Sequence, residues 1–308
     1  MPVQLRGGST TPAAARPRDF NSLSSATEHP SEATAPLVAV DQAALRRRER
    51  FISIALRSAS IVGFFVLWYA ASLLNQYVWK LFNPVLLPPP HKVLEAGIEL
   101  TLSGELIRDI AASLYRVVMG FLVAAALGVG LGTLIGRSRR LEQLLEPPLE
   151  LLRPIPPLAF LPVLVLWFGI GEMSKVVFIA YAAFFPIFTT TCEGIKFVDV
   201  LLIRAAQTLG ASEREIFRYV VLPAASPSII TGLRVGFAQC LFVIVAAEFL
   251  AADSGLGYLI NDARSFFLMS HMLLGAAVIG LIGLVFNTAL RHLEARLLRW
   301  RVDARGSR

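Results

Sequence analysis

The chain of 308 residues is 55% hydrophobic and 17% charged, whereas ordinary soluble domains are about 45–50% apolar and about 25% charged. A soluble core could not cover that much apolar surface without leaving large patches exposed to water, so the composition favours a membrane protein. A soluble protein with a large all-helical core is the weaker alternative. The net charge of +7 is compatible with nucleic-acid binding, but the basic residues flank apolar segments, so we attribute the charge to membrane topology and expect no nucleic-acid partner.

The first 50 residues are rich in Ser, Thr, Ala and Pro and contain no apolar run long enough for the core of a signal peptide. This composition predicts a disordered cytoplasmic tail over residues 1–50. A membrane domain is predicted for residues 51–300 and a short C-terminal tail for residues 301–308.

Six apolar segments follow one another along the chain, at residues 58–79, 113–135, 157–171, 174–194, 228–251 and 272–290. A helix that crosses a bilayer needs about 20 apolar residues. Five segments reach that length, and the third does so only if its helix begins before Pro157. The predicted fold class is therefore an all-α membrane protein with about six transmembrane helices.

Basic residues are distributed unevenly between the two sides that six spans would create. With the N-terminus inside, the cytoplasmic segments 46–50, 137–153, 196–218 and 291–308 hold eighteen Lys and Arg, against five on the outer side. Such a bias fixes the orientation of membrane proteins during insertion. The sequence thus predicts that both termini are cytoplasmic, and that the basic C-terminal segment rests on anionic membrane lipid.

Glycines recur every four residues in the second apolar segment, at Gly128, Gly132 and Gly136. Glycines with this spacing line one helix face and let another helix approach closely. The same stretch could suggest a nucleotide-binding loop, but the third glycine of that motif is missing and no strand precedes it. We therefore predict helix packing.

The third and fifth segments contain candidates for the translocation pathway. Four prolines, at 154, 156, 157 and 162, must bend or break the third span, and freed backbone carbonyls are tolerated at membrane depth only against protein or a watery cavity. We therefore predict Pro157 and Pro162 to line a pathway, with a kinked helix of no further role as the alternative. Gln239 and Glu248 are the candidates in the fifth segment. Glu248 precedes a glycine-containing stretch typical of a re-entrant turn or outer gate, although an acid near a span end is often a plain interface residue.

The cytoplasmic loop at residues 196–224 contains clear start and stop signals for two short helices. Asp199 can cap a helix that runs to about Leu209, and Gly210 supplies the left-handed residue that ends it. Ser212 and Glu215 form a capping box for a second helix. We expect Pro223 to end this second helix before the fifth span.

The first of these short helices is apolar almost all round, although it is too short to cross a membrane. A cytoplasmic helix with apolar residues on every face must be covered on more than one side. One side can be covered by the chain itself and the other by a partner, with Ala205, Ala206 and Gly210 permitting a close approach. A re-entrant or merely buried connecting helix is the alternative.

This loop resembles the cytoplasmic signature of permeases of binding-protein-dependent ABC importers, which reads Glu-Ala-Ala, three residues, Gly, nine residues, Ile, any residue, Leu-Pro. The chain matches the pattern at Ala205, Ala206, Gly210, Leu222 and Pro223. It departs at Arg204, where the family usually has Glu, and conservatively at Val220. The resemblance runs from about residue 58 to 300, and the proline-rich third span is similar to the branch that serves sulfonates, taurine, nitrate and certain vitamin precursors.

The resemblance implies the type I ABC importer permease architecture in a bacterial cytoplasmic (inner) membrane. The residues that it implies in coupling to an ATPase are Arg204, Ala205, Ala206, Gly210, Ala211, Leu222 and Pro223. It further implies a second permease copy, a separate dimer of ATPase subunits that bind ATP and Mg, and a periplasmic or lipid-tethered solute-binding protein. The solute would be small and anionic, with an aliphatic sulfonate or taurine first and nitrate, bicarbonate or a vitamin precursor next.

Because the chain lacks the phosphate-binding G-x-x-x-x-G-K-[ST] motif, we do not expect it to hydrolyse ATP itself. We expect it to be no enzyme and to hold no cofactor, metal or catalytic residue. Two alternative functions belong to other classes of protein than an ABC importer permease. A secondary transporter driven by an ion gradient would show internal repeats and ionisable residues deep in the membrane, but the spans do not divide into matching halves and their centres are nearly uncharged. An intramembrane enzyme is disfavoured because neither H-E-x-x-H nor G-x-S-x-G occurs.

Overall fold

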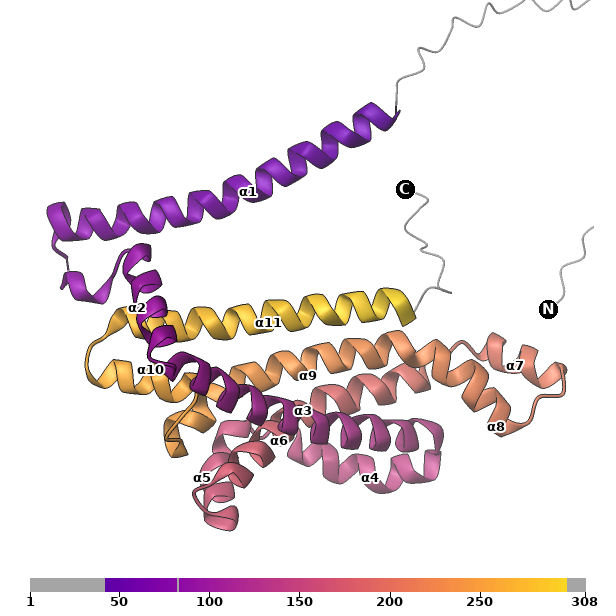
Figure 1. Cartoon of the computed structure of the whole chain (residues 1–308). Coiled ribbons are helices and arrows are strands. Elements are labelled where there is room, and N and C mark those ends of the chain that lie inside the picture. The colour runs from indigo at the N-terminus through magenta and orange to yellow at the C-terminus, as the bar shows by residue number, and fades with distance from the viewer. Residues whose placement is uncertain (1–41, 82, 298–308) are drawn as a thin grey trace, which may run out of the picture. The chain divides into compact units, whose positions relative to one another are not determined.

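The computed structural model describes residues 42–81 and 83–297 and is nearly all helical there (Figure 1). The chain divides into two units, Met1–Ser60 and Ile61–Arg308. The predicted tail at 301–308 and most of the predicted N-terminal tail lie outside the described residues. Residues 42–50, which we expected to be disordered, instead begin a helix, because their Ala, Leu, Arg, Glu and Gln residues favour helix formation.

The helices, in chain order, are α1 (Gln42–Leu74), the π-helical turn η1 (Asn75–Trp79), the 3₁₀ turn η2 (Pro84–Leu86), α2 (Pro90–Leu102), α3 (Glu105–Arg137), α4 (Arg139–Leu152), α5 (Pro157–Phe168), α6 (Glu172–Lys196), α7 (Val200–Thr208), α8 (Glu213–Ile216), the π-helical turn η3 (Phe217–Val221), α9 (Leu222–Ala251), α10 (Leu256–Ser265) and α11 (Met269–Leu297).

Five helical stretches are long and apolar enough to cross a membrane, namely Phe51–Val78, Glu105–Arg137, Glu172–Lys196, Glu213–Leu250 and Met269–Arg296. The pair α4 and α5 meets the same criterion only when taken together, and the two helices are bent by 95° at their junction. Counting that pair, the described residues provide up to six spans. Pro154 and Pro156 lie in the break between the two helices, so the predicted breaking of the third span by prolines is confirmed.

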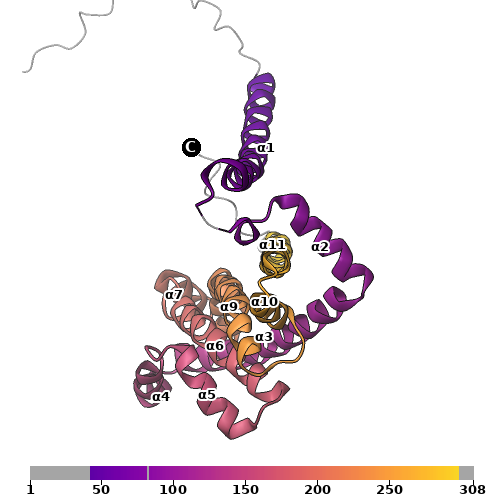
Figure 2. The same cartoon turned by 90° about the vertical axis from the view of Figure 1, so that its left-hand side faces the viewer.

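The core of the second unit is formed by α3, α6 and α9, which pack side by side (Figures 1 and 2). Its largest cluster of buried side chains draws on these three helices and on α5, with Phe178, Ile179 and Ile187 of α6 at its centre. In a lipid environment helices associate through close van der Waals packing, not through exclusion of water. The geometry of these contacts therefore decides how firmly the bundle holds together.

The predicted role of the glycines on α3 is confirmed by their neighbours on α6. A Cβ atom added to Gly128 would lie 2.9 Å from the Ile187 side chain, and one added to Gly132 would lie 2.8 Å from Thr191 Cβ. A Cβ at Gly136 would lie 3.0 Å from Ile195 Cβ. The α3 and α6 backbones are thus so close that any side chain at these positions would require a neighbour to move.

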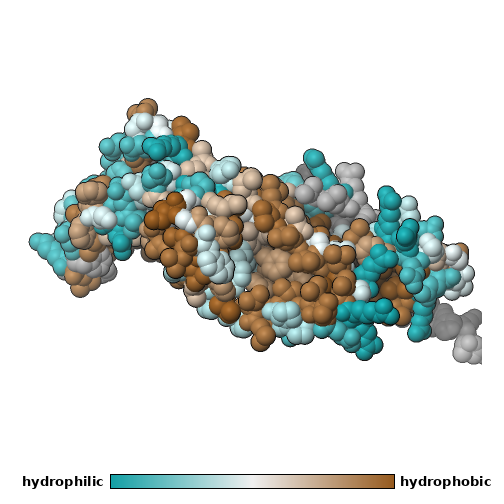
Figure 3. All heavy atoms as spheres, turned by 90° about the horizontal axis from the view of Figure 1, so that it is seen from below, coloured by the Kyte–Doolittle hydropathy of each residue, from teal (hydrophilic) through white to brown (hydrophobic). Residues whose placement is uncertain are grey.

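The surface of the molecule agrees with burial in a bilayer. On the face shown in Figure 3, apolar residues occupy the middle, and polar residues gather toward the two ends. Exposed apolar side chains include Leu122 and Leu134 of α3, Phe242 of α9, and Leu284 of α11. Water-soluble monomers rarely expose continuous apolar patches of this kind, whereas the acyl chains of lipids cover them without penalty.

Candidate functional site

Short-range signals determine both ends of α7, as the sequence predicts. The Asp199 side chain accepts a hydrogen bond of 2.8 Å from the Leu201 backbone N–H and so caps the first turn. Gly210 has a φ of 79° and lies directly after the end of the helix. The Ala211 N–H then donates to the Ala206 carbonyl at 3.1 Å, which satisfies a carbonyl of the last turn.

The predicted capping box is also present. Ser212 Oγ accepts from the Glu215 backbone N–H at 3.4 Å, and the Ser212 N–H donates to Glu215 Oε2 at 2.8 Å. The expectation that Pro223 ends this helix is wrong, because α8, η3 and α9 form one helical stretch from Glu213 to Leu250. Pro223 lies in the first turn of α9, where a residue without an N–H is tolerated, and the wider π-helical turn of η3 precedes it.

One face of α7 packs on its own chain. Ile203, Ala206 and Ala211 contact a small apolar cluster formed by the ends of α6 and α9 together with α8 and η3, whose buried members are Ile195, Val198, Ile216, Val221 and Ala225. This packing connects α7 to two of the three helices that form the bundle core. A displacement of α7 would therefore move the adjoining ends of α6 and α9 with it.

The other face of α7 is uncovered by any described part of the chain. No residue of α7 is buried, and the Leu201 and Leu209 side chains are 71% and 87% exposed. Leu201, Arg204, Ala205 and Thr208 follow an i, i+3, i+4, i+7 spacing, so they share this outward face. The described part of the chain thus covers α7 on one side only, which argues against a helix that is merely buried within its own chain. Cover of the second side by a partner stays a prediction.

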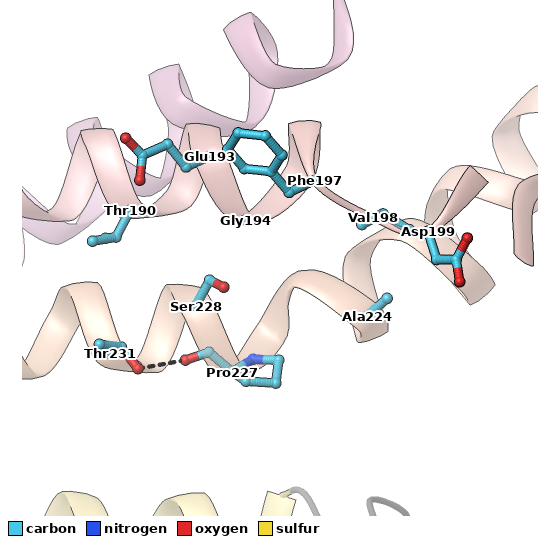
Figure 4. A pocket seen from close by; sticks show the side chains of 10 residues that line it. All are labelled: Thr190, Glu193, Gly194, Phe197, Val198, Asp199, Ala224, Pro227, Ser228 and Thr231. Carbon is cyan, nitrogen blue, oxygen red and sulfur yellow. Dashed lines mark hydrogen bonds between the residues drawn. The ribbon is translucent and has the colours of Figure 1, made fainter. Parts of the chain in front are cut away.

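A groove of 520 Å³ lies beside the root of this loop, between α6 and α9 (Figure 4). Figure 4 shows Thr190 and Ser228 pointing into the space between the two helices, whereas the Glu193 carboxylate points away from α9. The groove is lined in addition by Gly194, Phe197, Val198, Asp199, Ala224, Pro227 and Thr231. The groove thus extends to Asp199, the residue that caps α7.

The four predicted pathway residues are not brought together into one site. Pro157 is half-buried in the first turn of α5, and Pro162 is exposed within the same helix. Gln239 is half-buried on α9, whereas the Glu248 side chain is fully buried. Glu248 belongs to a cluster of ion pairs.

The centre of this ion cluster is Arg116 of α3, which sequence reasoning missed. Arg116 Nη1 lies 2.7 Å from Glu248 Oε1 of α9, and Nε and Nη2 contact Glu172 of α6 at 2.7 and 2.8 Å. The arginine is 2% exposed, and it also donates to the Ser254 carbonyl at 2.6 Å. A single buried guanidinium therefore joins α3, α6, α9 and the turn that precedes α10.

The same cluster satisfies the backbone at the start of α10. Glu248 Oε2 accepts from the Gly257 N–H at 2.7 Å, and Asp109 Oδ1 accepts from the Gly255 N–H at 2.8 Å. Ser113 Oγ accepts from the Leu256 N–H at 2.7 Å and donates to Glu248. Buried backbone groups at a helix N-terminus need such partners. The carboxylates thus fix the turn at Gly255 that leads into α10. In Figure 1, α10 lies at the end of the bundle opposite α7.

A further ion pair joins Arg234 of α9, within the predicted fifth span, to Glu294 of α11, which lies beyond the end of the predicted sixth span. Arg116 lies near the start of the predicted span 113–135 and Arg234 near the start of the predicted span 228–251, so both charges lie toward span ends and not at the centres. Both arginines are paired with carboxylates, as charged groups within membrane helices usually are. Within residues 42–81 and 83–297 no group of three or more His, Cys, Asp or Glu residues could hold a metal ion.

Comparison with known proteins identifies the family. Residues 106–299 match the family described as binding-protein-dependent transport system inner membrane component. The taurine transport system permease protein TauC of Escherichia coli (strain K12) is 40% identical over 240 residues, which cover 76% of this chain and 85% of TauC. A relative from Bacillus subtilis (strain 168), SsuC, whose name refers to aliphatic sulfonates transport, is 39% identical and covers 73% and 81% of the two chains.

Solved structures show the same fold at low sequence identity. A chain of the MetNI methionine ABC transporter in an inward-facing conformation has a TM-score of 0.52 at 18% identity, over 62% of this chain and 97% of that chain. The family match at residues 106–299 includes most of the bundle core, the Arg116 ion cluster and the α7 loop. This chain therefore belongs to the family of binding-protein-dependent transport system inner membrane components, the multi-pass permease subunits of ABC importers.

Proposed function

We propose that the chain forms, together with a second identical copy, the translocation pathway for a small anionic solute, with taurine or another aliphatic sulfonate as the first candidate. The names of TauC and SsuC support this choice. Nitrate is the next candidate, because the nitrate import permease protein NrtB of Leptolyngbya laminosa is 36% identical over 190 residues, which cover 62% of this chain and 68% of NrtB. Bicarbonate or a vitamin precursor is the candidate solute after nitrate.

The observation that carries the coupling role is the uncovered apolar face of α7. A capped helix of nine residues with exposed leucines cannot stand alone in water, so it requires a partner that covers this face. We assign this partner as a separate ATPase subunit, one for each permease copy, which binds ATP and Mg. Arg204 and Ala205 would contact it directly, while Ala206, Gly210 and Ala211 would hold the shape of the loop, and Leu222 and Pro223 its junction with α9.

Transmission of movement follows from the contacts of α7. When the ATPase subunits close around ATP, they would displace α7, and the apolar cluster beneath it would carry the movement to the inner ends of α6 and α9. Coupling requires a rigid element with two positions that both sites can bias. The hydrogen bonds of Asp199 and of the Ser212–Glu215 box give the loop that rigidity.

The uneven distribution of Lys and Arg supports an orientation with α7 and both termini in the cytoplasm. A periplasmic or lipid-tethered solute-binding protein would then deliver the solute at the end that holds α10. Pro157, Pro162 and Gln239 remain the candidates for the pathway, whereas the buried position of Glu248 favours a part in holding the outer end together.

Ala205→Glu tests the coupling role. Because Ala205 is exposed, the variant should fold and insert, but a buried unpaired carboxylate in the ATPase interface should lower substrate-stimulated ATP hydrolysis and taurine uptake at least about tenfold. Both are measured in proteoliposomes that contain the complete transporter. Gln143→Glu, which adds the same charge on an exposed position of α4, is the matched control. Normal uptake and normal stimulated hydrolysis in the Ala205 variant would refute the role of α7.

A further inference from the structure

Arg204 is the charged residue of α7, and it emerges from the middle of the uncovered face. The other eight residues of the helix carry no charge. Arg204 is exposed and shares its face with Leu201 on the preceding turn and Thr208 on the following turn. A partner that covers the leucines on this side of α7 therefore also covers the position from which the guanidinium projects.

No carboxylate in the described part of the chain neutralises this guanidinium. The ion pairs of the structure involve Arg116, Lys175, Lys196 and Arg234, and none reaches Arg204. Of the acids nearby in the chain, Asp199 caps the Leu201 N–H and Glu215 closes the capping box, and Glu213 forms none of the ion pairs of the described residues. The positive charge thus remains available to a partner.

Covering a guanidinium without a counter-charge is unfavourable, because the group loses water and gains nothing in return. A planar guanidinium has five N–H donors in a fixed arrangement that matches a carboxylate with two parallel hydrogen bonds. We infer that the ATPase surface that covers α7 carries a carboxylate opposite Arg204, and that this pair selects the ATPase that the permease accepts. The inference rests on the proposed function and specifies the chemistry of its partner.

The inferred pair makes a prediction about partner choice. An ATPase with a basic residue opposite position 204 would be rejected by repulsion between like charges, and one with an apolar residue there would leave the guanidinium unpaired. The resemblance to the family signature sharpens this point, because Glu is usual at this position and Arg reverses its charge. This permease should therefore not exchange its ATPase freely with permeases that carry the usual acid.

Arg204→Glu is the decisive variant, and it is tested with the ATPase subunit that co-purifies with the wild-type permease. Retention of the ATPase on the immobilised permease should weaken at least about 30-fold, since breaking a covered charge pair and adding a like charge both oppose binding. Arg204→Lys should retain more binding than Arg204→Gln. Arg214→Glu makes the same change at an exposed arginine of α8 and should have a much smaller effect.

The carboxylate itself is located by charge exchange. Each acidic residue on the permease-facing surface of the ATPase is replaced with arginine in turn, and one such variant should restore binding to the Arg204→Glu permease while losing binding to the wild type. If wild-type permease retains no ATPase at all, the proposed function fails. If it does retain the ATPase, but Arg204→Glu binds equally well or no exchange restores its binding, the carboxylate opposite Arg204 is refuted while the proposed function stands.

Discussion

Arg116→Met is expected to lower the free energy of unfolding by about 3–5 kcal/mol, because it leaves the buried Glu248 carboxylate without its counter-charge. The Glu248 side chain is fully buried, and three helices and the turn before α10 meet at the arginine. Hydrogen bonds from Ser113 and Gly257 would remain, but these neutral donors cannot balance the charge. Denaturant unfolding of the detergent-solubilised permease measures the loss.

Two further variants separate charge from packing at this site. The double variant Arg116→Met with Glu248→Met removes both buried charges, so it should be more stable than Arg116→Met alone. Glu172→Gln should have a smaller effect, because the Glu172 side chain is 50% exposed and water can replace part of its ion pair. If Arg116→Met unfolded at the same denaturant concentration as the wild type, the cluster would not hold this end of the bundle together.

Gly132→Leu is expected to disrupt the packing of α3 against α6. A Cβ at this position would lie 2.8 Å from Thr191 Cβ and 2.9 Å from the Phe188 carbonyl oxygen, and a carbonyl of the helix backbone cannot move away as a flexible side chain can. The remaining leucine atoms would force the helices apart, at a cost of about 3 kcal/mol or more. The permease should then lose its defined band on a native gel and unfold at a lower temperature.

Gly130 provides the control for this variant. It lies on the same helix, and no heavy atom lies within 4 Å of a Cβ added there. Gly130→Leu should therefore leave the native-gel band unchanged, although it adds the same side-chain volume as Gly132→Leu. Equal behaviour of the two variants would contradict the close approach of α3 and α6.

The parts of the fold that depend on local chemistry were predictable from the sequence. Asp199, Gly210 and the Ser212–Glu215 pair act on backbone groups within a few residues, so their spacing alone places the ends of α7 and the start of α8. The prolines around Pro157 likewise predicted the break that separates α4 from α5.

The parts of the fold that depend on contacts between distant residues could not be predicted from the sequence. Arg116 and Glu248 are separated by 132 residues, and neither lies in a local pattern that indicates the other. The only available signal was the presence of each charge in an apolar segment, which normally requires a partner. Pro223 was misjudged because its effect depends on whether the preceding turn can widen, as η3 does, and not on the proline itself.

Photo-crosslinking from position 201 in native membranes tests the central claim most directly, because the Leu201 side chain is 71% exposed on the uncovered face of α7. A photoreactive amino acid placed there should form its main crosslink to a cytoplasmic subunit that hydrolyses ATP. Crosslinks confined to the permease chain itself or to lipid, in membranes that still transport the solute, would contradict the assignment of α7 as the element that an ATPase drives.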